Sequence, residues 1–292
     1  MSFSSSIRRL FILVFITASS PYLHTDGNTL SSEEIMNRCV ARAELQYRAM
    51  EEVHFESEAT TENRKFNGDG EITETEILEQ IQYPLQGAVF EEIVSINGRP
   101  LNEEEKEKEE DKKRKFVEEV EKRRARGDYL QPEKERAIQF NEDFASRYTY
   151  ELVGTEEVRN FLCWVISFKP KEGKLPVRRT MDNALNQLFG TLWVSQDDYG
   201  LVRVDFAMRK PFKYWGGLVA VIRKTDGSVE YDRIEPNIWL PRHFELTLDI
   251  RIMLFKNIRQ TITKDWRNYR RVSSTGIRTD TGTSTSTNLT YP

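Results

Sequence analysis

The sequence predicts an α+β fold in which one strongly curved antiparallel sheet wraps around helices. The clearest observation is residues 243–254, where apolar side chains fall at every second position. A period of two is typical of a strand with one buried face. Similar stretches recur along the chain and are separated by short turn motifs. In addition, residues 31–50 and 102–145 have helical features, and a helix with an apolar side can cover the concave face of such a sheet.

The first element is predicted to be an amphipathic helix that begins after Ser31. Ser31 and Glu34 have the spacing of a capping box, and the apolar positions that follow recur at helical intervals: Ile35, Cys39, Ala43, Tyr47 and Met50. Alternation from Val53 and a turn at residues 67–70 then predict a hairpin, and residues 88–96 predict a third strand.

Residues 102–126 are predicted to form a solvated helix with a narrow apolar side. Acidic residues dominate its first half and basic residues its second half, a polarity that the helix dipole favours. Asn102 and Glu105 can cap its start. A second helix is expected near Pro132, so that residues 102–145 form a charged helical insertion between strands.

Further strands are expected from residue 148 onward, at 148–152, 161–168, 190–195 and 201–208. Residues 169–183 are expected to be a loop, and Asp197 and Asp198 a turn between strands. Residues 218–224 and 228–234 predict a hairpin around Asp226-Gly227, because Asp-Gly is a strong turn signal. The alternating stretch 243–254 then has residues 258–272 as its last partner. The count is about nine or ten strands in up-and-down order.

The two ends of the chain differ from this pattern. Residues 1–20 carry two arginines, then a short apolar run, then small residues, which predicts a secretory signal peptide. Residues 273–292 are rich in Ser, Thr and Gly and predict a disordered tail. Residues 21–272 are therefore expected to form a single domain of a periplasmic or secreted protein, soluble after signal cleavage.

Composition argues against several functions. The net charge of −4 does not favour a nucleic-acid-binding protein. Neither His54 nor His243 has metal-ligand spacing with Cys or acidic residues, and no nucleophile, base and orienting residue form a recognisable set. We therefore expect no enzyme, no metal site and no cofactor. Cys39 and Cys163 could pair in an oxidising compartment or be buried free thiols.

Several motifs resemble a known group of exported bacterial proteins. They are the stretch Gly190-Thr-Leu-Trp-Val-Ser-Gln-Asp-Asp-Tyr with the following Leu201-Val-Arg-Val, the Trp239-Leu-Pro motif before the long alternating strand, and the segments Tyr83-Pro84 and Asn97-Gly-Arg-Pro-Leu. Together they resemble an uncharacterised branch of the LolA/LolB-like lipoprotein-carrier superfamily, over residues 51–272. The resemblance implies an open half-barrel with helices over the concave face and an apolar cavity for acyl chains. The charged helix at 102–126 and the Ser/Thr-rich tail depart from the carriers.

These features lead to a functional hypothesis of a carrier for lipid or lipoprotein acyl chains, with peripheral or transient membrane contact. The acyl chains are expected to contact one face of two strands, at Val202, Val204, Phe206, Met208, Leu246, Leu248 and Ile250. The alternative is a periplasmic protein-interaction or stress-sensing module without lipid cargo, whose partner would be an envelope protein. The aromatic residues Phe212, Tyr214 and Trp215 could contact such a partner, or could plug one end of the sheet.

Overall fold

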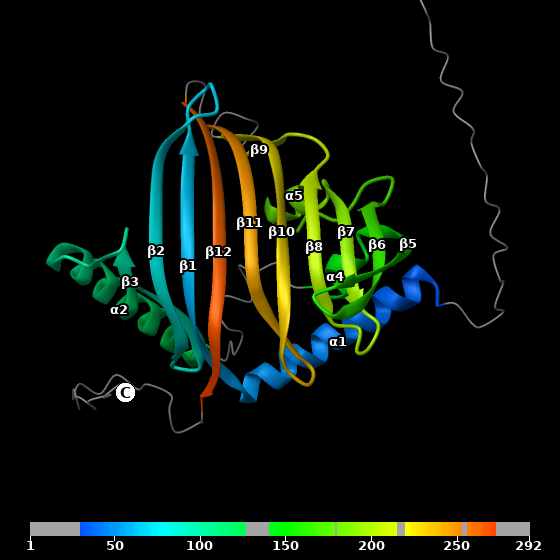
Figure 1. Ribbon diagram of the computed structural model, residues 1–292, viewed down its shortest axis with the longest axis horizontal. Coiled ribbons are helices and arrows are strands. Elements are labelled where there is room, and N and C mark those ends of the chain that lie inside the picture. Colours follow the sequence, from blue (N-terminus) through cyan, green and yellow to red (C-terminus); the bar gives the residue numbers. More distant parts are fainter. Residues whose placement is uncertain (1–29, 127–139, 179, 215–219, 253–255, 273–292) are drawn as a thin grey trace, which may run out of the picture. The chain divides into compact units, whose positions relative to one another are not determined.

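The computed structural model describes residues 30–126, 140–178, 180–214, 220–252 and 256–272 (Figure 1). The predicted signal peptide (residues 1–20), the predicted tail (residues 273–292) and the start of the second helix expected near Pro132 lie outside the described residues. The strands are β1 (His54–Phe66), β2 (Ile72–Leu85), β3 (Ala88–Ile96), β4 (Arg99–Pro100), β5 (Tyr148–Val158), β6 (Phe161–Pro170), β7 (Leu188–Ser195), β8 (Leu201–Met208), β9 (Phe212–Tyr214), β10 (Ala220–Glu235), β11 (Ile238–Ile252) and β12 (Lys256–Val272). The helices are α1 (Ser32–Glu52), α2 (Glu103–Ala125), α4 (Glu142–Ala145) and α5 (Thr180–Leu185).

The described strands form one open antiparallel sheet in the order β4-β3-β2-β1-β12-β11-β10-β8-β7-β6-β5, with β9 paired to β10. Two meanders, one from each half of the chain, join where β1 pairs with β12. The long central strands curve (Figure 1). The end strands, β4 and β5, do not pair with each other, so the sheet does not close. The predicted α+β class with an open, curved antiparallel sheet is confirmed.

The prediction of a hairpin at Asp226-Gly227 is wrong, because both residues lie inside the continuous strand β10. An Asp-Gly turn needs positive φ at both positions, and neither residue has one. Glycine is required here for a different reason. A Cβ on Gly227 would lie 2.4 Å from the carbonyl oxygen of Glu245 and 2.9 Å from the ring of Phe206. Gly227 thus lets a neighbouring strand and an aromatic ring approach the backbone.

A bulge in β11 places Trp239 on the same face of the sheet as the alternating apolar residues that begin at Phe244. The register of β10 and β11 shifts between the pairs Glu230–His243 and Tyr231–Pro241, which leaves Arg242 as the extra residue. Without this bulge, Trp239 would lie on the same side as His243 by strict alternation. With it, Trp239 shares a face with the apolar side chains from Phe244 onward.

Helix α1 crosses the concave face of the sheet (Figure 1). At its first turn, Ser32 Oγ donates a hydrogen bond to the carbonyl of Tyr150 on β5 at 3.0 Å. In its second half, the Gln46 side chain makes two hydrogen bonds with the backbone of Trp239 on β11, at 2.7 and 2.9 Å. The predicted cap is confirmed, since Ser31 Oγ accepts from the Glu34 amide. The helix therefore ties β5 to β11 across the strands between them.

The other helices are shorter or more exposed. Helix α2 has the predicted capping box of Asn102 and Glu105, and its Phe116 and Val117 pack against a cluster on β2 and β3. Most of its other contacts are exposed ion pairs between residues three or four apart, which contribute little each. The expected loop at 169–183 contains the start of α5, which was not predicted. Asp197 and Asp198 lie in a turn, as predicted.

We predict that Gly227→Ala lowers the free energy of unfolding by about 1–3 kcal/mol, because the added methyl group meets backbone and a ring with no room to move. Chemical denaturation measures this effect. Gly154→Ala is the matched control, since nothing lies within 4 Å of the position of its Cβ, and it is expected to change stability by less than about 0.5 kcal/mol. Equal effects of the two substitutions would contradict the placement of Gly227 within the sheet.

Both cysteines are buried free thiols, and burial raises the pKa of Cys39 to about 12 and that of Cys163 to about 11. We predict that a disulfide-exchange reagent at pH 8 finds no reactive thiol in the native chain and finds both after denaturation without reductant.

The raised pKa values mean that the stability from both thiols is complete below about pH 9 and is lost as the pH rises toward 11–12. The double variant Cys39→Ala/Cys163→Ala should therefore lose less stability over that range. In the thiol-exchange experiment, a denatured chain without reactive thiols would contradict the assignment of Cys39 and Cys163 as free cysteines.

Candidate functional site

An apolar strip lies on the concave face of β8, β10, β11 and β12. Its members are half-buried side chains at corresponding positions of these neighbouring strands. We define this concave strip as Val204, Phe206, Met208, Val229, Leu246, Leu248, Ile250, Ile258 and Ile262. Six of the seven residues predicted to contact acyl chains belong to it, so residues predicted on two separate strands do share one face.

The strand register explains how the strip is assembled. Val204 pairs with Val229, which pairs with Phe244. One step along, Leu246 lies between Gly227 and Ile262. Directly opposite residues of an antiparallel pair point to the same side. Because β8, β10 and β11 each alternate without interruption over this part, their apolar residues form a continuous surface.

The ring of Phe206 fills the centre of the strip. Its partners in the neighbouring strands are both glycines, Gly190 on β7 and Gly227 on β10, so no Cβ occupies the space on either side. The ring lies close to the backbone of Gly227, since a methyl group added at this glycine would come within 2.9 Å of the ring's Cζ atom. An aromatic ring beside strand glycines covers their backbone and fixes the register.

Val202 has a different position from the other predicted residues. It is fully buried and packs in a cluster with Cys163 and Trp239, so it forms part of the core where α1 crosses the sheet.

The structure describes the predicted partner-binding residues only in part. Phe212 and Tyr214 lie in the backbone of β9, their side chains are outside the described part, and Trp215 lies outside the described residues.

A polar group beside Leu248 of the strip was not predicted from the sequence. Thr225 pairs with Leu248 and is buried, and its Oγ1 has no hydrogen-bond partner among the described residues. A buried hydroxyl without a partner loses the hydrogen bonds it would make to water. Thr225 could therefore donate a hydrogen bond to a ligand that lies on the strip.

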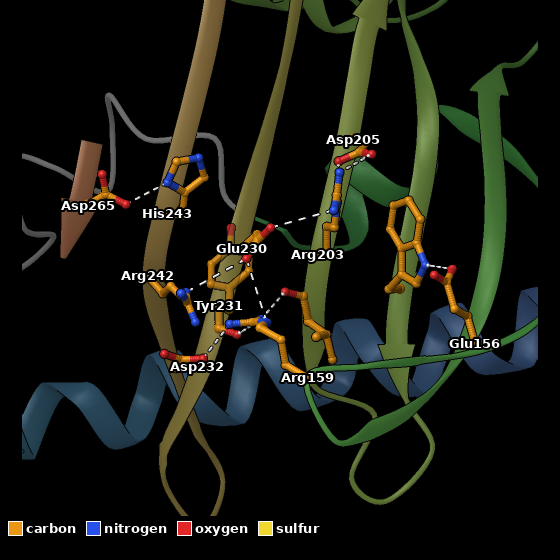
Figure 2. A network of polar contacts seen from close by, with 12 residues as sticks. Glu156, Arg159, Arg203, Asp205, Glu230, Tyr231, Asp232, Arg242, His243 and Asp265 are labelled. Carbon is orange, nitrogen blue, oxygen red and sulfur yellow. Dashed lines mark hydrogen bonds and ion pairs between the residues drawn. The ribbon is translucent and has the colours of Figure 1, made fainter. Parts of the chain in front are cut away.

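The opposite face of the same strands carries a network of charged side chains (Figure 2). At its centre, the Glu230 carboxylate lies 3.7–3.9 Å from three arginines, Arg159, Arg203 and Arg242. These arginines have further acidic partners, such as Asp232 at 2.6 Å from Arg159 and Asp205 at 2.7 Å from Arg203.

The edges of this charged network are also paired. His243 Nδ1 lies 2.7 Å from Asp265 (Figure 2), and the indole of Trp193 donates to Glu156 at 2.8 Å. Cross-strand pairs of this kind stabilise an exposed sheet face. The convex face is thus polar and rich in ion pairs, whereas the concave strip is apolar and half-buried.

Two open hollows lie away from the strip, at the β5 end of the sheet. One, of about 510 Å³, lies between α1 and the start of β5. The other, of about 810 Å³, is lined by residues of β5, β6 and β7, including the exposed Phe189. No strip residue lines either hollow.

Within the described ranges, no cluster of three or more His, Cys, Asp or Glu residues is arranged to hold a metal ion. Likewise, none of the helices that the structure describes is long and apolar enough to cross a membrane.

Comparisons with known proteins find no matching family model and no matching curated protein. Solved structures that are similar to this chain, at low sequence identity and low TM-score, include the following three. A DUF1329 family protein from Desulfovibrio piger has 14% identity and a TM-score of 0.34, covering 88% of this chain and 96% of that one. A LolA superfamily protein from Nitrosomonas europaea has 10% identity and a TM-score of 0.30, with 86% and 99% covered.

The third is a putative outer membrane lipoprotein-sorting protein domain from Vibrio parahaemolyticus, with 10% identity and a TM-score of 0.35. It covers 83% of this chain and 95% of that one. Solved structures similar to this chain thus include a LolA superfamily protein and a lipoprotein-sorting protein domain.

Proposed function

We propose that this chain is an exported, non-enzymatic protein that binds acyl chains of a lipid or lipoprotein on the concave strip. The observation that carries the proposal is the continuous set of half-buried apolar side chains on β8, β10, β11 and β12. A flexible alkyl chain is a suitable occupant because the strip follows neighbouring strands and presents methyl groups and one aromatic ring.

Burial of apolar surface would provide the affinity. Each buried methylene contributes about 0.8 kcal/mol, so a single acyl chain can bind usefully and still dissociate. The charged convex face would remain in water, since its side chains already pair with one another. Such a division of the two faces suits a protein that takes up a chain at a membrane and releases it.

A second candidate is the protein-interaction module without lipid cargo. Strand β5 favours it, because it ends the sheet and exposes Leu152 and Val153, with 40% and 65% of their surface accessible. An extended segment of an envelope protein could add to such an edge. The bulge between Leu152 and Gly154 works against this, since bulges protect edges from pairing.

We predict that Leu248→Lys weakens binding of a fluorescent fatty acid to the full chain by about tenfold or more, because it places an ammonium group in the centre of the strip. Thr247→Lys is the matched control. Thr247 is the adjacent residue of β11 and points to the convex face, where it pairs with Asp226. Circular dichroism verifies that both variants fold.

Two results would count against acyl binding on the strip. One is a wild-type chain that binds no fluorescent fatty acid and yields no lipid in its organic extract. The other is equal weakening by Leu248→Lys and Thr247→Lys. A stable protein partner recovered together with either result would favour the interaction module.

A further inference from the structure

A small cavity lies between α1 and the sheet, at the end of the strip. It has a volume of about 60 Å³ and is lined by Arg42 and Gln46 of α1 and by Tyr231 and Trp239 of the sheet, among other residues. A water molecule takes up about 30 Å³ in the liquid. The cavity therefore has room for about two water molecules or for one small polar group.

The charged group at this cavity is Arg42. Its Nε and Nη2 atoms are buried and have no hydrogen-bond partner in the part of the chain that the structure describes. Burial lowers the pKa of this guanidinium, and the charge of Asp198 opposes that effect. Buried donor atoms of a charged group are costly when they have no hydrogen-bond partner.

Asp198 makes no hydrogen bond to these two nitrogens, and its carboxylate has other partners. Its Oδ2 accepts from the indole of Trp239 at 3.0 Å, and its Oδ1 accepts from the amide of Gly200 at 3.0 Å. It also lies 3.8 Å from Arg233. Arg42 thus contributes a positive charge to the cavity, while the carboxylate of Asp198 is engaged by other groups.

The two free nitrogens form the edge of the guanidinium that binds a carboxylate with two parallel hydrogen bonds. The same pair of atoms does so elsewhere in this protein. Nε and Nη2 of Arg203 donate to the two oxygens of Asp205 at 2.7 and 2.8 Å, and those of Arg64 donate to Glu62 at 2.8 and 2.9 Å. At Arg42 this edge has no partner among the described residues.

The cavity and the strip lie on the same face of β10. Tyr231 lines the cavity, and Val229 and Gly227 follow it at every second position on the same face. At about 3.3 Å per residue, the distance along β10 from Tyr231 to Thr225 is about 20 Å. A long alkyl chain can lie along this line with one end at Arg42.

We propose that Arg42 binds the carboxylate of a fatty acid whose alkyl chain lies on the concave strip. This inference rests on the proposed function and narrows it, because it selects free fatty acids among acyl ligands. The carboxylate would accept hydrogen bonds from Nε and Nη2 of Arg42 and would supply the hydrogen-bond partner that these two nitrogens lack.

The test is a comparison of dodecanoate, dodecanol and acetate binding to the full chain by calorimetry. The wild-type chain should bind dodecanoate about tenfold or more tightly than dodecanol, and acetate far more weakly. Arg42→Gln should remove the preference for dodecanoate and leave dodecanol affinity unchanged, which also shows that the variant folds. Arg42→Lys keeps the positive charge but cannot donate the two parallel hydrogen bonds of a guanidinium. It should therefore show a preference for dodecanoate between those of the wild-type chain and Arg42→Gln. The exposed Arg48 provides the control on the same helix, and Arg48→Gln should keep the full preference.

The outcomes separate the two proposals. If dodecanoate and dodecanol bind equally well to the wild-type chain, or if Arg42→Gln keeps the preference, the role of Arg42 is overturned while acyl binding stands. If acetate binds as tightly as dodecanoate, the cavity is a site for small anions and the fatty-acid assignment is overturned. If neither dodecanoate nor dodecanol binds, both proposals fail.

Discussion

The arrangement of this fold depends on how Trp239 joins α1 to the sheet. Gln46 on α1 forms a pair of hydrogen bonds with its backbone, as a neighbouring strand would. Its indole donates to Asp198 in the β7–β8 turn and packs against Phe161 at 4.8 Å between ring centroids. The fit is close, because a Cβ on Gly200 would lie 2.0 Å from the indole nitrogen. One residue, Trp239, thus connects α1 with β11, with the β7–β8 turn and with Phe161 of β6.

The junction between Trp239 and α1 lies at one end of the concave strip and leaves the strip half-buried. Helix α1 crosses the sheet where Tyr231 and Trp239 lie, and the core there is filled by residues such as Val202. Beyond the crossing, the same face of β8, β10 and β11 continues with apolar side chains that are only partly covered. The junction therefore separates a packed core from an apolar surface that can accept a ligand. Arg42 lies at the boundary between these two regions.

Much of the fold could be predicted from the sequence because alternation and turn motifs report local geometry. The strand at 243–254, its partner at 258–272 and the caps at Ser31 and Asn102 are confirmed over the described residues. The failure at Asp226-Gly227 has a tertiary cause, since the glycine makes room for Glu245 and Phe206 from other strands. No local pattern contains that information.

The site was only partly predictable from the sequence for a similar reason. Alternation within β8 and β11 identifies their apolar faces, but it does not show that Val202 is enclosed whereas Val204 is half-buried. The absence of a hydrogen-bond partner for the Arg42 guanidinium likewise depends on the whole fold.

The most direct test of acyl binding on the concave strip is photo-crosslinking with a fatty acid that carries a diazirine in the middle of its alkyl chain. After irradiation of the full chain and proteolysis, mass spectrometry locates the labelled peptides. We predict labels on peptides that contain residues 204–208 and 246–250, and competition by unlabelled fatty acid. Labels confined to β5 or to the charged convex face, or no label that unlabelled fatty acid competes away, would contradict acyl binding on the strip.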